Sequence, residues 1–382
     1  MHPVISDLST LVAMPTISTR PVTEIAALLA SRCEDLGFVI ELFDDPVEAG
    51  KTNVVASIGP QRPGGLVLSG HMDVVPTQGQ QWASDPFHLT ERQGRLHGRG
   101  SADMKGFIAA CLQALAAIDR GSWLRPLVLI WTHDEEIGCH GSAHLAHSWQ
   151  AAGRSLPEAC LIGEPTDFRL LRMHAGHVAA RVQIQGQAAH TAFPELGANA
   201  VVAASMVVQA VADLAEQLRQ EQGQQAAELA RPWVPMSVVG IDGGSAMNIV
   251  PDRCEVRIGF RPLPGMDHGA IWERLLAAVR GLPLPPGTQA TAEVLRVTPS
   301  LCSPTSTALE RALAPHAEPG DTASAPFATD GGNLARLGAT PLVFGPGSIA
   351  VAHKADEFIA TADLIRSVAI IERLVRGFCC AS

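Results

Sequence analysis

The feature that most constrains the fold is a regular alternation of short apolar runs with longer segments of helical periodicity. This order predicts an α/β fold with a mostly parallel sheet covered by helices, because each helix returns the chain to the same edge of the sheet. Uncharged aliphatic runs such as Leu127–Trp131 are typical of strands buried on both faces. Strands are predicted at 38–43, 53–58, 66–69, 127–131, 159–162 and 341–344, and helices at 23–36, 102–118, 306–313 and 361–375.

The middle of the chain has a different pattern, in which a two-sided strand and a long helix precede a pair of strands and another helix. These segments lie at 178–185, 199–220, 235–240, 254–260 and 271–279. Their order is that of a compact α+β unit, and 382 residues are more than one core usually contains. We therefore predict a catalytic domain made of residues 1–173 and 298–382, with an α+β domain inserted at 174–297.

Composition argues against several classes of protein. The net charge of −10 argues against binding to nucleic acid or to an anionic membrane surface. The most apolar helical stretch, 198–215, is interrupted by polar residues and is not expected to span a bilayer. The N-terminus lacks the basic region of a secretory signal, and eight scattered cysteines without a C-x-x-C pair indicate a reducing compartment. We expect a soluble cytoplasmic protein, with an exposed Gln- and Glu-rich helix or loop at 216–230.

Three consecutive acids, Asp134, Glu135 and Glu136, come directly after the predicted strand at 127–131. Charges that cannot reach water are costly unless they pair or bind a metal ion. A solvated loop explains one acid run by itself, so the interpretation depends on the residues at the ends of the other strands. In open α/β sheets the carboxyl ends of the parallel strands line one crevice, where residues distant in sequence converge.

Five candidate metal ligands lie at such strand ends or in the loops beyond them. Two histidines and three carboxylates form a nitrogen and oxygen set that suits zinc, cobalt or manganese. Five protein ligands are too many for one tetrahedral ion with an open position, and they suit two ions about 3.5–4 Å apart that share a carboxylate. Asp103 is the best bridge, because it heads a predicted helix. The set is His71, Asp103, Glu136, Glu164 and His353.

Neighbouring residues have predicted roles beside these ligands. Asp73 lies two residues beyond His71, where a carboxylate can hold the second nitrogen of the imidazole. Glu135 is predicted to take a proton from the attacking water and to deliver it to the leaving amine. Asp134 is interpreted as a loop acid without a chemical role. Cys139 is not predicted to be a nucleophile, because no base is visibly paired with it.

Six segments in a fixed order resemble those of a known family. They are SGHMDVVP, HGRGSADMKG, DEEIG, GEPT, QAAHTAFPELGANA and AHKADEF. The chain resembles the co-catalytic metallopeptidase family that includes acetylornithine deacetylase, succinyl-diaminopimelate desuccinylase, aminoacylase and glutamate carboxypeptidase, and the resemblance covers nearly its whole length. It implies a zinc-exopeptidase-like catalytic domain with two divalent ions, zinc or cobalt. It further implies one ion on His71, Asp103 and Glu164, the other on Asp103, Glu136 and His353, and Glu135 as general acid and base.

Within this family, the segments VTPSLCSP, ATDGGNLARLG and GPGSIAVAHKADEFI are most similar to those of acetylornithine deacetylases. The resemblance therefore implies hydrolysis of N-acetyl-L-ornithine to acetate and ornithine, a step of arginine biosynthesis. The alternatives are a succinyl-diaminopimelate desuccinylase, a broad N-acyl-amino-acid hydrolase or dipeptidase, and a catalytically silent relative that binds metal or amino acid. Relatives often carry a basic residue where this chain has Ala175, which leaves the identity of the acyl amino acid open.

The resemblance also gives expectations for the inserted domain. In the family this domain forms a homodimer, which implies that His190 reaches the partner's active site and stabilises the oxyanion, a contribution of about 2.7–4 kcal/mol. Arg261 and Asn248 match positions near the α-carboxylate of the substrate, and arginine is the natural bidentate partner of a carboxylate. Gly347, in the segment GPGS, is expected to bring backbone N–H groups close to the substrate.

Overall fold

The chain forms two compact units in a computed structural model that describes residues 2–221, 228–229, 231–320 and 322–381. The first unit contains residues 1–173, 303–325 and 329–382, and the second contains residues 174–302 and 326–328. The chain therefore returns to the first unit at Ser303, whereas the sequence prediction places the return at 298. Strand β12 continues to Thr298, and the short strand β13 (Leu301–Cys302) comes after it.

The first unit is built on a six-stranded sheet in the order β1-β2-β6-β3-β7-β15. Strands β6, β3, β7 and β15 are parallel, whereas β1 and β2 are antiparallel to their neighbours. The prediction of an α/β fold with a mostly parallel sheet is confirmed. The strands are β1 (Val39–Asp44), β2 (Thr52–Ile58), β3 (Leu66–His71), β6 (Leu127–Thr132), β7 (Ala159–Ile162) and β15 (Thr340–Val343).

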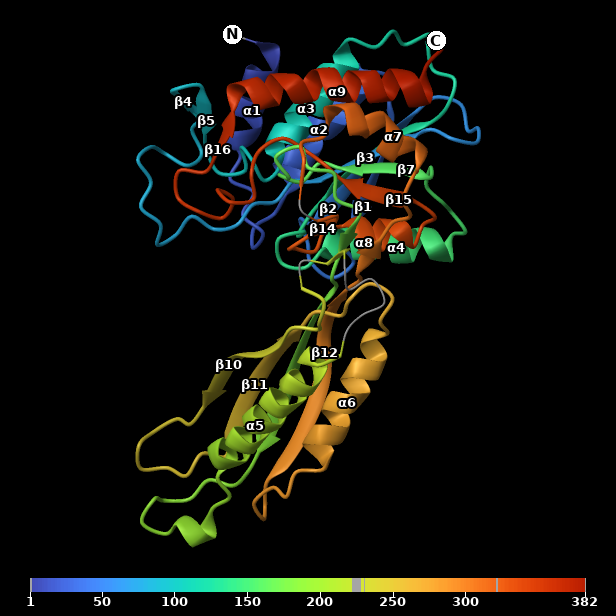
Figure 1. The fold of residues 1–382 in the computed structure, drawn as a ribbon. Coiled ribbons are helices and arrows are strands. Elements are labelled where there is room, and N and C mark those ends of the chain that lie inside the picture. Colours follow the sequence, from blue (N-terminus) through green and yellow to red (C-terminus); the bar gives the residue numbers. More distant parts are fainter. Residues whose placement is uncertain (1, 222–227, 230, 321, 382) are drawn as a thin grey trace. The chain divides into compact units, whose positions relative to one another are not determined.

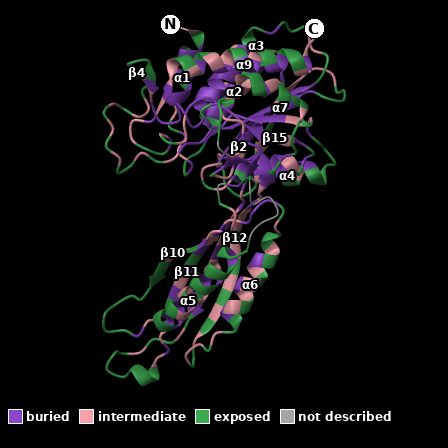
Figure 2. Ribbon diagram, viewed as in Figure 1, coloured by how far each residue is buried: buried purple, intermediate pink, exposed green. Residues whose placement is uncertain are grey.

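Helices cover both faces of this sheet (Figure 1). One face is covered by α1 (Pro3–Val12), α2 (Thr23–Asp35), α3 (Lys105–Ala116) and α9 (Thr361–Cys379), and the other by α4 (His140–Ala151) and α8 (Gly331–Ala335). Buried residues fill the space between the sheet and these helices (Figure 2). Helix α9 packs against this core because its buried Leu364, Ile371, Leu374 and Val375 recur at helical spacing and form one apolar stripe.

Several shorter elements complete the first unit and its connections. The strands β4 (Thr90–Arg92), β5 (Arg95–His97) and β16 (Phe358–Ala360) form a small antiparallel sheet. The chain also forms α7 (Ala308–Leu313), the 3-10 turn η3 (Ala314–His316) and the two-residue strands β8 (Met173–His174) and β14 (Ser324–Ala325). Of these elements, only α7 was predicted from the sequence.

The second unit is a four-stranded antiparallel sheet with two helices on one face. The sheet order is β10-β11-β9-β12, and the alternation of β9 explains its two faces, since Val178, Ala180, Val182 and Ile184 are buried while Gln183 is exposed. The elements are β9 (His177–Gln185), β10 (Met236–Gly243), β11 (Arg253–Phe260), β12 (Gln289–Thr298), α5 (Ala200–Arg219), α6 (His268–Arg280) and the 3-10 turn η1 (Pro194–Leu196).

Helix α5 is long and apolar enough to cross a membrane by length and composition alone, contrary to the sequence expectation for 198–215. In the second unit it is an amphipathic helix whose Val207, Val211 and Leu214 are buried. The Gln- and Glu-rich stretch continues from the end of α5 into residues 222–227 and 230, which lie outside the described residues.

Candidate metal and catalytic site

The candidate ligands of the first unit come from the carboxyl ends of its parallel strands. His71 is the last residue of β3, Glu136 lies in the loop after β6, and Glu164 lies two residues beyond β7. Asp103 lies two residues before α3, and His353 belongs to the loop between β15 and β16. Because β6, β3, β7 and β15 are parallel and adjacent, their ends meet at one edge of the sheet.

The distances show which of these side chains converge. The Nε2 atom of His71 lies 3.0 Å from Oδ1 of Asp103, and Nε2 of His353 lies 3.2 Å from Oδ2 of the same carboxylate. His353 Nε2 also lies 2.9 Å from Oε2 of Glu136. The two oxygens of Asp103 therefore contact two histidines from different segments, which is the arrangement that a bridging carboxylate requires.

The remaining acids, Glu135 and Glu164, also lie close to His71. Ligand atoms of His71, Glu135 and Glu164 all lie within 4.8 Å of one another, as do those of His71, Asp103 and Glu136. Glu164 is buried, and so is Asp103. The structure thus brings together all five predicted ligands of the first unit, with Glu135 among them.

Electrostatics at this edge favour a bound cation. Burial and the charge of Glu164 raise the pKa of Glu135 well above its usual range, and burial and Asp103 raise the pKa of Glu164 in the same way. Burial and Asp103 raise the pKa of Glu136 to about 7. Hydrogen bonds with Asp103 and Glu136 raise the pKa of His353 to about 10. Clustered buried carboxylates with nitrogen donors beside them fit divalent ions, which supply the missing positive charge.

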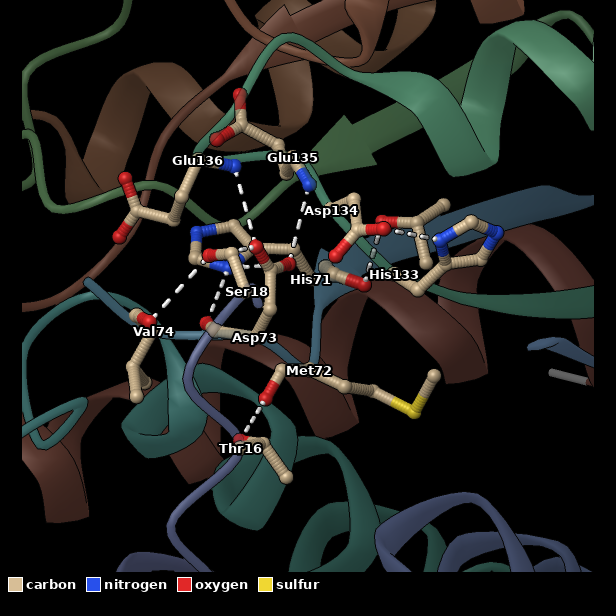
Figure 3. A network of polar contacts seen from close by, with 12 residues as sticks. Thr16, Ser18, His71, Met72, Asp73, Val74, His133, Asp134, Glu135 and Glu136 are labelled. Carbon is tan, nitrogen blue, oxygen red and sulfur yellow. Dashed lines mark hydrogen bonds and ion pairs between the residues drawn. The ribbon is translucent and has the colours of Figure 1, made fainter. Parts of the chain in front are cut away.

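Asp73 holds the site in a way that the sequence did not indicate (Figure 3). The Nδ1 atom of His71 contacts the backbone carbonyl of Asp73 at 2.9 Å, whereas the nearer carboxylate oxygen lies 3.7 Å away. That carboxylate instead accepts the backbone N–H groups of Glu135 at 3.0 Å and Glu136 at 3.3 Å. It also accepts the hydroxyl of Ser18 at 2.8 Å. Asp73 therefore orients the imidazole through its main chain and the acidic loop through its side chain.

Asp134 is buried and doubly paired, which its interpretation as a loop acid did not foresee. Its Oδ1 lies 2.5 Å from Nζ of Lys51, and its Oδ2 accepts from Nδ1 of His133 at 3.1 Å. Burial opposes ionisation, but the hydrogen bonds from His133 and Lys51 keep the pKa of Asp134 below its usual value. Asp134 also has a φ of 52°, in the left-handed region.

A second buried network supports Asp103 and His353. Oε1 of Glu357 accepts the backbone N–H of Asp103 at 3.1 Å, and its other oxygen lies 2.5 Å from Nη1 of Arg99. Arg99 Nη2 donates to Oε1 of Gln80 at 2.8 Å, and Nε2 of Gln80 donates to the carbonyl of His353 at 2.8 Å. Arg99 and Glu357 lie in the motifs GRGSADMKG and AHKADEF, so their position inside the motifs was the available signal.

Cys139 behaves as expected from the sequence. Its thiol is buried and lies 3.4 Å from Oε1 of Glu135 as a hydrogen-bond donor. Burial and the charge of Glu135 raise the pKa of this thiol well above its usual range, so it is not a ready nucleophile. The nearby Asp330 accepts the hydroxyls of Thr132 at 2.6 Å and Ser142 at 2.5 Å.

Gly347 has a φ of 82°, and a Cβ at this position would lie 3.1 Å from that of Ala102. Its carbonyl accepts the N–H of Asp167 at 2.7 Å. A Cβ on Gly345 would lie 2.6 Å from the carbonyl oxygen of Glu164. These glycines therefore allow the loop after β15 to pack closely against the segments that carry Asp103 and Glu164.

The predicted residues of the second unit lie at its two ends. His190 and Asn248 are exposed neighbours beyond the end of β9, where Thr191 N–H donates to the carbonyl of Asn248 at 3.1 Å. Arg261 comes directly after the last residue of β11, which pairs with Val178 at the start of β9. One copy of this unit therefore presents Arg261 at the end where the chain enters, and His190 with Asn248 at the opposite end.

Histidines and carboxylates that converge at the strand ends of a helix-covered α/β sheet are the arrangement that a metal-dependent hydrolase uses. The chain matches the sequence model of Peptidase family M20/M25/M40 over residues 67–377, and it belongs to this family. It is 34% identical to an acetylornithine deacetylase from Proteus mirabilis over 93% of this chain and 89% of the relative. A second acetylornithine deacetylase, from Photorhabdus laumondii, is 33% identical over 99% of this chain and 98% of its own length.

Solved structures agree with the fold. An M20 family metallo-carboxypeptidase from Sulfolobus solfataricus has a TM-score of 0.78 at 17% identity, covering 98% of this chain and 99% of its own. A dinuclear metal-binding peptidase of the M20 family from Bacillus subtilis has a TM-score of 0.67 at 15% identity, covering 97% and 96% of the two chains. The protein is a metal-dependent hydrolase of this family.

Proposed function

We propose that this hydrolase removes the acetyl group from N-acetyl-L-ornithine, releasing acetate and L-ornithine, as a step of arginine biosynthesis. The observation that carries the proposal is the convergence of two histidines and four carboxylates at one edge of the sheet, with Glu135 among them. The two relatives named acetylornithine deacetylase support the choice of substrate, since each matches most of the chain.

In this proposal, His71, Asp103 and Glu164 would hold one ion, and Asp103, Glu136 and His353 would hold the other. The ions are zinc or cobalt, which the same nitrogen and oxygen donors satisfy. When bound, they supply Lewis acidity to the amide carbonyl and activate water for attack. The contacts of Asp103 with both histidines support its place as the shared ligand.

Glu135 is the proposed general base and acid. It takes a proton from the attacking water and delivers it to the amide nitrogen as the C–N bond breaks. Burial and the charge of Glu164 raise its pKa, and a more basic carboxylate is a better acceptor for the proton of the attacking water. The thiol of Cys139 donates a hydrogen bond to Oε1 of this carboxylate at 3.4 Å, which helps to orient it.

His190 is the proposed oxyanion donor, and it acts from the inserted domain of a partner subunit in a homodimer. Its Nδ1 accepts a hydrogen bond from the N–H of Ala192 at 3.0 Å, so in the neutral imidazole Nε2 carries the hydrogen. This Nε2–H group can donate a hydrogen bond to an oxyanion. The large apolar side chains around it support an interface, because Phe193, Leu196, Met247 and Ile249 are exposed.

Arg261 is proposed to bind the α-carboxylate, and Asn248 of the partner and the loop of Gly347 are proposed to contact the same substrate. Among the described residues, no carboxylate forms an ion pair with Arg261. Burial and the charge of Arg231 lower the pKa of Arg261. A half-buried guanidinium beside another cation favours an anionic ligand. Since Arg261 and Asn248 lie at opposite ends of the unit, two subunits supply them in this proposal.

The test is hydrolysis of N-acetylornithine, N-succinyl-diaminopimelate, N-acetylmethionine and a dipeptide by protein loaded with zinc or cobalt. A preference of about a hundredfold or more in kcat/KM for N-acetylornithine is expected. Glu135→Gln should abolish hydrolysis at nearly unchanged metal content. Equal rates on the acetylated substrates would point to a general aminoacylase, and hydrolysis by Glu135→Gln would contradict the proposed base.

The cytoplasm is the proposed location of the protein. All eight cysteines are free thiols, which supports a reducing compartment.

A further inference from the structure

The acidic loop after β6, residues 134–136, must direct two neighbouring side chains to one site. Glu135 and Glu136 are consecutive, yet both side chains must reach the same centre, one as base and one as ligand. Asp134, immediately before them, has a φ of 52°, in the left-handed region that few non-glycine residues occupy. Something in the first unit must therefore fix this loop.

Lys51 closes a ring of contacts around the loop. On one side its ammonium lies 2.5 Å from Oδ1 of Asp134. On the other side it donates to the backbone carbonyl of Ser18, whose hydroxyl donates to Asp73. The carboxylate of Asp73 then accepts the N–H groups of Glu135 and Glu136, which returns the ring to the loop (Figure 3).

The sheet itself places Lys51 in this ring. Strands β2 and β6 are antiparallel, and their register pairs Val54 with Trp131. Continuing this register by three residues sets Lys51 opposite Asp134, just beyond the last strand pair. The next residues of the same segment add support, since Asn53 accepts the backbone N–H of His133 at 3.2 Å and donates to the carbonyl of Gly141 at 2.8 Å.

Burial isolates this ring of contacts from water. The side chains of Lys51 and Asp134 are 4% and 3% exposed, so neither charge has access to much water and each depends on its protein partners. Asp134 has one further partner, the imidazole of His133, which is fully buried. A shift of Lys51 would therefore remove the positive charge that pairs with Asp134, and it would also remove the hydrogen bond to the carbonyl of Ser18.

We propose that Lys51 is a positioning residue for hydrolysis, which sets the directions of Glu135 and Glu136 through Asp134 on one side and through Ser18 and Asp73 on the other. Its ammonium contacts Asp134 and the carbonyl of Ser18, which are not among the candidate metal ligands. The proposal rests on the proposed roles of Glu135 as base and Glu136 as metal ligand.

The experiment compares Lys51→Met with the double variant Lys51→Met/Asp134→Asn, which removes both charges together. We expect kcat to fall at least tenfold in both variants with KM changed less than threefold. We expect the unfolding midpoint to fall in the single variant and to recover in the double. A merely structural ion pair would predict that activity recovers with stability, and that result, or a kcat within threefold of wild type in either variant, would overturn the proposal.

Cobalt titration of the metal-free proteins gives a readout that does not need turnover. Misplacing Glu136 should weaken cobalt binding at least tenfold in both variants, as removal of groups that orient ligands commonly does. Unchanged cobalt affinity in the double variant would overturn the role assigned to Lys51. If wild-type protein cleaves none of the four substrates, the proposed function fails by itself, while the cobalt titration still decides the role of Lys51.

Discussion

Replacing Gly163 with alanine is expected to destabilise the first unit, because the end of β7 leaves no room for a side chain. A Cβ added to Gly163 would lie 2.0 Å from Cγ of Phe107 and 2.2 Å from both of its Cδ atoms. Phe107 is 1% exposed in α3, so its ring cannot turn out into solvent to make room. Overpacking of a dense core costs about 1–3 kcal/mol, and a contact this short on a buried ring places the expected loss at about 3 kcal/mol.

Unfolding in urea measures this loss, and two further variants test its cause. Phe107→Leu shortens the ring that the new methyl group meets, so the double variant should be at least about 1 kcal/mol more stable than additivity predicts. Gly377→Ala is the control, since this glycine is exposed in α9 and a Cβ added to it would meet nothing within 4 Å, and alanine there should stabilise by about 0.5–1 kcal/mol. A loss below about 0.5 kcal/mol in Gly163→Ala, or strict additivity with Phe107→Leu, would refute the steric argument.

Two more perturbations concern buried charges. Glu357→Gln leaves Arg99 buried without its carboxylate and should cost about 3–5 kcal/mol in urea unfolding, and a loss under about 1 kcal/mol would contradict the importance of the pair. Burial, reinforced by the charge of Arg261, lowers the pKa of His174 from 6.5 to about 4. The unfolded chain therefore binds more protons, so stability should fall by up to about 3 kcal/mol as the pH falls from 6.5 to 4. His174→Leu should flatten this pH dependence, and equal slopes would exclude His174 as its source.

The strands that could be predicted from sequence are those with uninterrupted apolar residues, such as β6, and those with a clear alternation of apolar and polar residues, such as β9. Strand β6 is buried along its whole length, and its composition showed this. Strand β12 was missed because its alternating inward residues include small alanines such as Ala290 and Ala292, which resemble a loop or a helix as much as a strand. The antiparallel pairing of β1 and β2 was also missed, since the sequence of a strand does not specify its direction.

Prediction of the candidate site from the sequence was limited by the same lack of strand direction and register. Reasoning from strand ends was enough to gather the histidines and carboxylates, because parallel neighbours share an edge. The contacts of Asp134 and Asp73 depend on register instead. Lys51 becomes a partner of Asp134 only when β2 and β6 are known to be antiparallel, and no feature within the segment GKTN indicates this. Arg99 and Glu357 lie within recognised motifs, but their pairing required coordinates.

The insertion of one unit into the other determines the order in which the chain can be completed during synthesis. Strand β7 is made before the inserted residues, while its parallel neighbour β15 pairs Leu342 with Leu161 and is made after them. The edge of β7 that β15 covers therefore stays unpaired on the ribosome until residues 340–343 have emerged, whereas the strands and helices of the inserted unit are synthesised earlier. Since His353 comes after β15, the set of candidate ligands is complete only when synthesis is almost finished. Metal binding by the full set would therefore report that the whole first unit has folded.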